Sequence, residues 1–105
     1  MVKAIVVGDP HEWEQQGHSL PAEGLAFVGF HDVTQETLDH YQPSVIFSPL
    51  LAKNFDCIDL AVLLNSLGYS VEYQALAVGV PKPELIEREV RQLCTQLKFR
   101  IVEAA

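Results

Sequence analysis

The 105-residue chain has few cations, no long apolar run and little cysteine, and each shortage excludes a class of protein. Seven Lys and Arg stand against fourteen Asp and Glu, and the formal net charge of −7 argues against binding to nucleic acid or to an anionic membrane. No stretch approaches the roughly 20 apolar residues that span a bilayer, and the N-terminus lacks an apolar run of signal-peptide length. We therefore expect a cytoplasmic protein.

The sequence motifs of metal, redox and dinucleotide sites are also missing. Cys57 and Cys94 form no CxxC pair and lie in separate predicted helices, so we expect two reduced thiols on the core side. The four histidines share no metal-ligand spacing. The G-x-G-x-x-G pattern of dinucleotide sites is absent, and Gly8 alone does not replace it. We expect neither a metal nor another cofactor.

The composition that is present is that of a globular protein. Hydrophobic residues make up 49% of the chain and charged residues 20%, which is enough apolar material for a packed core. A chain of this length forms one core. We therefore expect a single domain over residues 1–105.

Apolar segments alternate with helical patterns along the chain. Five segments are predicted as strands: residues 4–7, 25–30, 45–47, 71–78 and 99–102. Three helices are predicted: one that Thr34 caps and Pro43 ends, one over residues 55–67, and one that begins at Pro83. Residues 9–23 carry prolines near both ends and are predicted as a loop, with room for one helical turn over residues 12–16.

This element order predicts an α/β domain of the flavodoxin-like type, with three layers or a reduced arrangement of two. Strands that alternate with helices imply a five-stranded parallel sheet, for which we expect the order 2-1-3-4-5 with three helices on one face. The helices that normally follow the first and last strands are missing from the pattern. The uncovered face should then be polar, and Glu72 and Gln74 could lie opposite Lys98 and Arg100. The first and third strands stay apolar on both faces, so we expect the 9–23 segment with Trp13 to cover them.

The last predicted helix is amphipathic. We expect its apolar stripe to face the sheet, and the stripe comprises Ile86, Val90, Leu93, Cys94 and Leu97. Glu84 with Arg88, and Glu87 with Arg91, have the i,i+4 spacing of ion pairs on the solvent side.

Ligands of open α/β sheets bind beyond the carboxyl ends of the strands, between the first and third strands. The candidate ligand crevice therefore comprises Asp9, His11, Ser48, Pro49 and Gly79. Trp13, in the segment after the first strand, is the candidate lid.

The element order and size resemble a response-regulator receiver domain over most of the chain. Receivers carry an acidic pair after the first strand, Asp after the third, Ser or Thr after the fourth and Lys after the fifth. Here the corresponding positions hold Gly8-Asp9, Ser48, Ala77-Val78 and Glu103. The resemblance implies the receiver fold and, because the phosphoacceptor Asp is replaced, a domain without phosphotransfer. One remaining carboxylate makes a poor Mg²⁺ site.

Lys82-Pro83 imitates the Lys–Pro pair that ends a receiver's fifth strand. In that register residues 71–80 would be the fifth strand and one strand would be unaccounted for. We favour the simpler interpretation, in which Pro83 begins a helix and Lys82 is a solvated loop residue.

A fainter similarity is to cobalamin-binding domains. Its residues are Asp9-Pro10-His11, Ser48-Pro49-Leu50 and Val78-Gly79, and it would make His11 an axial ligand. The chain departs from that pattern at Glu14, where the family carries Gly, at Val78, and in lacking a predicted helix after the histidine. An exposed loop histidine is the expectation that we favour.

The 55–67 helix has a second apolar stripe, made of Phe55, Ile58 and Val62, on the side away from the sheet. Either a neighbouring helix covers this stripe or another protein does, and a second copy of the chain is one such protein.

The function that we expect is a non-catalytic, receiver-like interaction or signalling module that binds a protein partner or forms a homodimer. The alternative is a small-molecule binder or sensor that uses the crevice. An enzyme is not expected, because no nucleophile–base pair can be assembled and no G-x-S-x-G motif surrounds Ser48.

Overall fold

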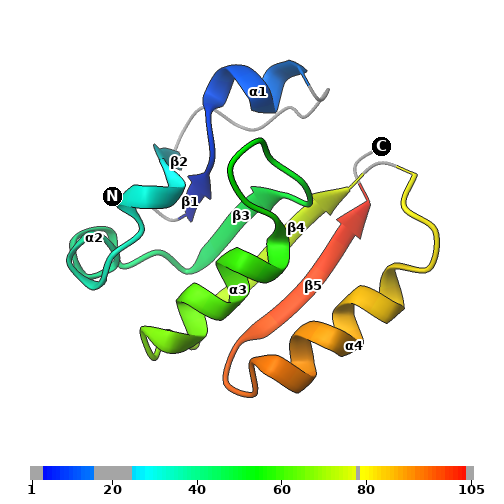
Figure 1. Ribbon diagram of the computed structural model, residues 1–105. Coiled ribbons are helices and arrows are strands. Elements are labelled where there is room, and N and C mark those ends of the chain that lie inside the picture. Colours follow the sequence, from blue (N-terminus) through cyan, green and yellow to red (C-terminus); the bar gives the residue numbers. More distant parts are fainter. Residues whose placement is uncertain (1–3, 16–24, 78, 104–105) are drawn as a thin grey trace.

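The structure, a computed structural model, describes residues 4–15, 25–77 and 79–103 (Figure 1). Its strands are β1 (Ala4–Val7), β2 (Leu25–Val28), β3 (Val45–Pro49), β4 (Glu72–Ala77) and β5 (Lys98–Glu103). Its helices are α1 (Pro10–Gln15), the 3-10 turn η1 (Phe30–Asp32), α2 (Gln35–Tyr41), α3 (Cys57–Ser66) and α4 (Pro83–Leu93). Within these ranges no helix has the length and apolar character needed to cross a membrane.

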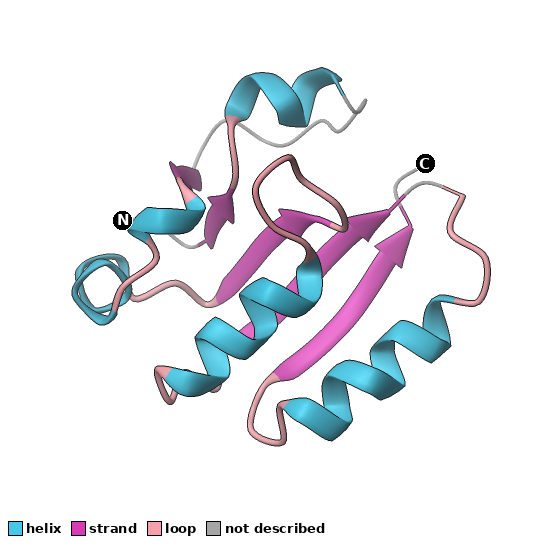
Figure 2. Cartoon of the chain, viewed as in Figure 1, coloured by secondary structure: helices cyan, strands magenta, loops and turns pink. Residues whose placement is uncertain are grey.

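The described strands form one sheet in which every neighbouring pair is parallel, with the order β2-β1-β3-β4-β5. Figure 2 shows α3 and α4 together on one face of this sheet. Buried side chains of α2, α3 and α4 meet that face in one apolar core. This arrangement is the flavodoxin-like one and confirms the predicted fold class and strand order.

β1 lies inside the sheet, with β2 on one side and β3 on the other. Ile5 and Val7 face the helices and belong to the core, whereas Val6 points to the opposite face and is still fully buried. The strand is therefore covered on both faces, as its uninterrupted apolar sequence predicts.

Side-chain caps fix where α2 and α3 begin. The Thr34 hydroxyl accepts a hydrogen bond from the Thr37 backbone N–H at 3.2 Å, as predicted for α2. At α3, Asp56 accepts from the Asp59 N–H while the Asp59 carboxylate accepts from the Asp56 N–H. This capping box makes Cys57 the first helical residue, so Phe55 lies before the helix and not within it.

α4 begins at Pro83, which confirms the favoured register. Lys82 precedes it in the left-handed region, at φ 53°, and does not end a strand. Val90, Cys94 and Leu97 are buried as predicted.

The prediction that Leu93 faces the sheet is wrong, because this side chain is 53% exposed. The helix is turned so that Glu87 faces β5, where its Oε2 accepts a hydrogen bond from the Ile101 N–H at 2.9 Å. Leu93 lies on the opposite flank of the stripe and is rotated into solvent. Arg91 still pairs with Glu87, at 3.9 Å between Nη2 and Oε1.

The expected absence of a first helix is also wrong. Residues 10–15 form α1, a helix longer than the one turn allowed for in the 9–23 segment. Asp9 stabilises its start, because Oδ1 accepts from the His11 N–H at 2.9 Å and the Asp9 carbonyl accepts from the Trp13 N–H at 3.0 Å. Residues 16–23 of the predicted loop lie outside the described residues.

The face of the sheet opposite α3 and α4 is polar over β4 and β5. Glu72 pairs in register with Lys98, and Gln74 with Arg100. Arg100 Nε also lies 3.5 Å from Glu72 Oε1 across the two strands. The predicted polar pairing on this face is therefore confirmed.

Candidate functional site

A crevice of about 230 Å³ lies at the carboxyl ends of β1, β2 and β3. The loops that follow these three strands form its walls. Its polar lining comprises Asp9, Glu12, His31, Asp32, Lys53 and Asn54. The crevice thus lies where open α/β sheets bind ligands.

The wall that follows β1 begins with a glycine in an unusual conformation. Gly8 has φ 142°, which L side chains rarely adopt, and its N–H donates to the Val28 carbonyl at 2.9 Å. The chain then turns directly into Asp9 and α1. Because Asp9 Oδ1 caps α1, part of this carboxylate is already engaged in holding the fold.

An aromatic pair forms the apolar wall. Phe30 in η1 stacks on Phe55, with ring centroids 4.7 Å apart and an interplanar angle of 9°. The sequence predicts that β2 continues to Phe30, but the strand ends at Val28 and the chain turns through η1. This turn places His31 and Asp32 in the crevice.

The third wall is the loop between β3 and α3, and it is connected to α1. The Lys53 N–H donates to Glu12 Oε1 at 3.0 Å, which joins two segments 41 residues apart. The crevice is lined by a lysine, Lys53, and by the acidic residues Asp9, Glu12 and Asp32. Charges of both signs therefore stand beside an aromatic wall.

Ser48 and Pro49, two predicted crevice residues, are buried in the protein instead. Side chains alternate along β3, so Ser48 shares the helix-facing side with Ile46, and both are fully buried. The Ser48 hydroxyl donates to the Pro49 carbonyl at 2.9 Å and lies 2.5 Å from the Tyr73 hydroxyl. A Tyr73 hydroxyl that donates to Ser48 satisfies both groups. The prediction that Ser48 lies in the crevice is therefore wrong.

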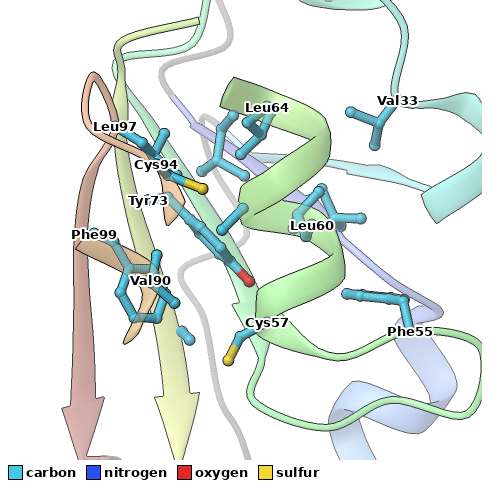
Figure 3. Close-up of a cluster of buried hydrophobic side chains, with 14 of the residues drawn as sticks. Val33, Phe55, Cys57, Leu60, Leu64, Tyr73, Val90, Cys94, Leu97 and Phe99 are labelled. Atoms are coloured by element: carbon cyan, nitrogen blue, oxygen red, sulfur yellow. The ribbon is translucent and has the colours of Figure 1, made fainter. Parts of the chain in front are cut away.

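Figure 3 shows Tyr73 within the apolar core, with its hydroxyl directed toward the first turn of α3. Burial raises the pKa of Tyr73 well above its ordinary value, so the phenol is neutral. Burial, followed by the charge of Asp56, raises the pKa of the nearby Cys57 thiol to about 11. Neither group is an activated nucleophile.

The other predicted crevice residues also lie apart from one another. Gly79 follows β4, and its N–H donates to Glu103 Oε1 at 2.9 Å, which ties the ends of β4 and β5 together. His11 is exposed on α1, and Trp13 is buried, but neither lines the crevice. Of the five predicted crevice residues only Asp9 lines it. The cobalamin-like pattern is not assembled either, because His11 and Ser48 do not meet there.

The apolar stripe of Phe55, Ile58 and Val62 is not a continuous surface. Phe55 is buried against Phe30, and Ile58 is partly buried against the core. Val62, at 45% exposed, remains open to solvent. Of the two interpretations, coverage within the chain holds for Phe55 and largely for Ile58.

The described part of the chain contains no group of three His, Cys, Asp or Glu side chains that could hold a metal ion. Comparisons with protein-family models, with curated proteins and with solved structures found no match to this chain. The function must therefore be inferred from the fold and from the crevice itself.

Proposed function

We propose that the protein is a non-catalytic, receiver-like module that acts by binding a protein partner and is not phosphorylated. The observation that carries the absence of phosphorylation is the position of Ser48. It occupies the end of β3, where a receiver carries its phosphoacceptor, yet its hydroxyl is fully buried and bonded to Pro49 and Tyr73. A phosphoryl donor in solvent cannot reach this oxygen without disruption of the core.

Two other features support the same proposal. Where a receiver carries a lysine after β5, this chain has Glu103, whose carboxylate holds the Gly79 N–H. An anion there would repel a phosphoryl group and could not stabilise it. Asp9, the carboxylate that remains after β1, uses one oxygen to cap α1.

Incubation with acetyl phosphate and Mg²⁺, followed by intact-mass spectrometry, tests the proposal. We expect no phosphoryl adduct, and no beryllofluoride complex in ¹⁹F NMR spectra under the same conditions. The controls are Ser48→Ala and Asp9→Asn. A saturable adduct that either substitution abolishes would refute the proposal.

A second candidate function, favoured by the crevice, is binding of a small metabolite. The volume of about 230 Å³ is below that of drug-sized pockets, which begin at roughly 300 Å³. Asp32 and Lys53 offer charges of both signs, and the pair of Phe30 and Phe55 offers an aromatic wall. These features fit a small zwitterionic molecule with an apolar part.

Native mass spectrometry of the protein purified from its own host tests this second function. A retained small molecule that Asp32→Asn and Lys53→Ala both release would support it. Trp13 provides a second readout, because it follows Glu12, whose carboxylate holds the Lys53 loop. An empty crevice together with Trp13 fluorescence that no metabolite changes would argue against it.

A further inference from the structure

The groove between β2 and α2 is a second concave surface, larger than the crevice, at about 500 Å³. Phe27, Val28 and Gly29 form its strand side, and one face of α2 forms the other. The exposed members of that face are Glu36 and His40, and Asp32 closes one end. The groove therefore combines a strand with an acidic wall.

Within the described residues, the strand side of this groove presents backbone groups with which no other strand pairs. β2 is an edge strand, since β1 is its one neighbour within the described sheet. The Val28 carbonyl accepts from the Gly8 N–H, which shows that Val28 bonds toward β1. Successive residues of a parallel strand bond to opposite sides. The N–H and C=O of Phe27 consequently point outward into the groove, where an added strand would meet them.

The wall of the groove selects for positive charge. Asp32 and Glu36 are both exposed, and no Lys or Arg occurs among the described residues that line the groove. On the opposite face of the sheet Phe27, in register with Val6, adds an apolar contact, because its side chain is 41% exposed. An extended segment with alternating basic and apolar side chains would match both the edge and the wall.

A second copy of the chain is a poor match for the same groove. Pairing of β2 with β2 would bring the Asp32 and Glu36 side chains of both copies to one edge, in a protein whose formal net charge is already −7. A nucleic acid or an anionic membrane is repelled for the same reason.

We propose that the β2–α2 groove binds a basic, extended peptide segment of a partner protein by β-strand addition. The segment pairs with the outward backbone of Phe27, and its Lys or Arg side chains meet Asp32 and Glu36. This inference rests on the proposed binding function and specifies its surface and the chemistry of the partner.

The first test is a selection from a displayed library of random peptides on the folded protein. The peptides are about ten residues long, enough to span β2 and its flanks. We expect enriched sequences in which Lys or Arg alternates with Val, Ile or Thr. Binding of labelled, synthetic members is then measured by fluorescence anisotropy. Raising sodium chloride from about 0.05 M to about 0.5 M should weaken binding, because the charges are exposed.

A matched pair of charge reversals locates the binding surface. Glu36 and Glu84 are both exposed and both occupy the second position of a helix, in α2 and α4 respectively. Glu36→Lys should weaken peptide binding about tenfold, whereas Glu84→Lys should leave it unchanged. Both variants make the same change in net charge, and each replaces an anion in the first turn of a helix by a cation.

Phe27→Pro tests strand addition directly. It removes an N–H that points away from β1, so the ladder between β1 and β2 is retained, and proline is tolerated on edge strands in this orientation. We expect loss of peptide binding with an unchanged far-UV circular dichroism spectrum. Phe27→Ala, which keeps the N–H, should weaken binding less than Phe27→Pro and provides a second variant if Phe27→Pro does not fold.

Several outcomes would overturn the groove inference. The inference fails if the folded protein enriches no peptide, or if the enriched peptides lack basic residues. It also fails if Glu36→Lys and Glu84→Lys change peptide binding equally. A host protein that co-purifies and binds the Glu36→Lys variant normally would overturn the groove inference while leaving the proposed function intact. A phosphoryl adduct on Ser48 or Asp9 would overturn the proposed function instead.

Discussion

Ser48 and Tyr73 form a buried polar pair in which the two hydroxyls are not equivalent. Ser48 has a second partner, the Pro49 carbonyl, whereas Tyr73 relies on Ser48. Removing Ser48 therefore leaves a buried phenol without its partner, and removing the phenol leaves a serine that still donates. The consequences for stability should be unequal.

We expect Ser48→Ala to lower the free energy of unfolding by about 2 kcal/mol and Tyr73→Phe by about 1 kcal/mol. Urea denaturation of the two single variants and of the double variant measures both effects and their coupling. The double variant should cost less than the sum, because it removes both polar groups together. Equal single effects that add fully would contradict the asymmetry.

The buried thiol of Cys57 and the buried phenol of Tyr73 should make stability depend on pH. Burial raises the pKa of the Cys57 thiol from 9.0 to about 11, and it raises the pKa of Tyr73 as well. Above pH 9 the unfolded chain releases the thiol proton while the folded protein retains it, so rising pH favours unfolding. Between pH 9 and pH 11 the thiol alone should remove roughly 2 kcal/mol of stability.

Urea denaturation at several pH values, in the presence of reductant, checks this decline. Cys57→Ala should lose stability less steeply than the native protein above pH 9. The native protein should be insensitive to this thiol below pH 8, where it is protonated in both states. Identical slopes for the two proteins would show that Cys57 is not the group responsible.

At the scale of single elements, the C-terminus of α2 contains a residue in an unfavourable conformation. Gln42 caps the helix at φ 44°, in the left-handed region, where glycine has no Cβ penalty. We expect Gln42→Gly to stabilise the protein by about 0.5–1 kcal/mol.

After α3 the left-handed position is already occupied by a glycine, Gly68. It has φ 72°, and a Cβ there would meet no atom within 4 Å, so Gly68→Ala isolates backbone strain from packing. That variant should be destabilised by about 1 kcal/mol. Thermal denaturation of both variants measures the difference, and a destabilised Gln42→Gly variant would refute the interpretation.

The elements that the sequence predicts well are those with a strong local pattern. The capping residue Thr34, the helix start at Pro83 and the apolar strand β1 each carry their own signal. The rotation of α4 about its axis has no such local signal in the sequence, because it depends on a hydrogen bond between Glu87 and the distant Ile101. Periodicity alone cannot show which flank of an apolar stripe faces the sheet.

At the scale of the whole molecule, the two edges of the sheet are treated differently. At β5, Glu87 accepts the outward Ile101 N–H, so a side chain occupies one of the positions where another strand would bind. We expect Glu87→Ala to lower stability by about 1–2 kcal/mol and to increase self-association.

Glu87→Gln is the matched control, because an amide oxygen can still accept from Ile101. It should remain closer to the native protein in both respects. Light scattering at rising protein concentration and urea denaturation measure the two effects. A Glu87→Ala variant that stays fully dispersed and stable would show that the edge is protected by other means.

The location of the candidate site could be predicted, but most of its residues could not. The topology alone places a crevice at the carboxyl ends of the strands, and Asp9 lies there. His31, Asp32 and Lys53 come from loops whose path depends on contacts made far away in the sequence, such as Phe30 on Phe55. Ser48 lies in the core and not in the crevice because β3 extends two residues further than its apolar run.

The central position of β1 has a consequence for how the protein is made. Of the described strands β1 leaves the ribosome first, and its neighbour β3 follows only after roughly 40 more residues, or about 2–8 s of synthesis. During that time Ala4–Val7 is an uncharged apolar strand that lacks β3 at one edge and α3 over its helix-facing side. Protection of the nascent chain over these seconds should therefore affect how much of the protein reaches its fold.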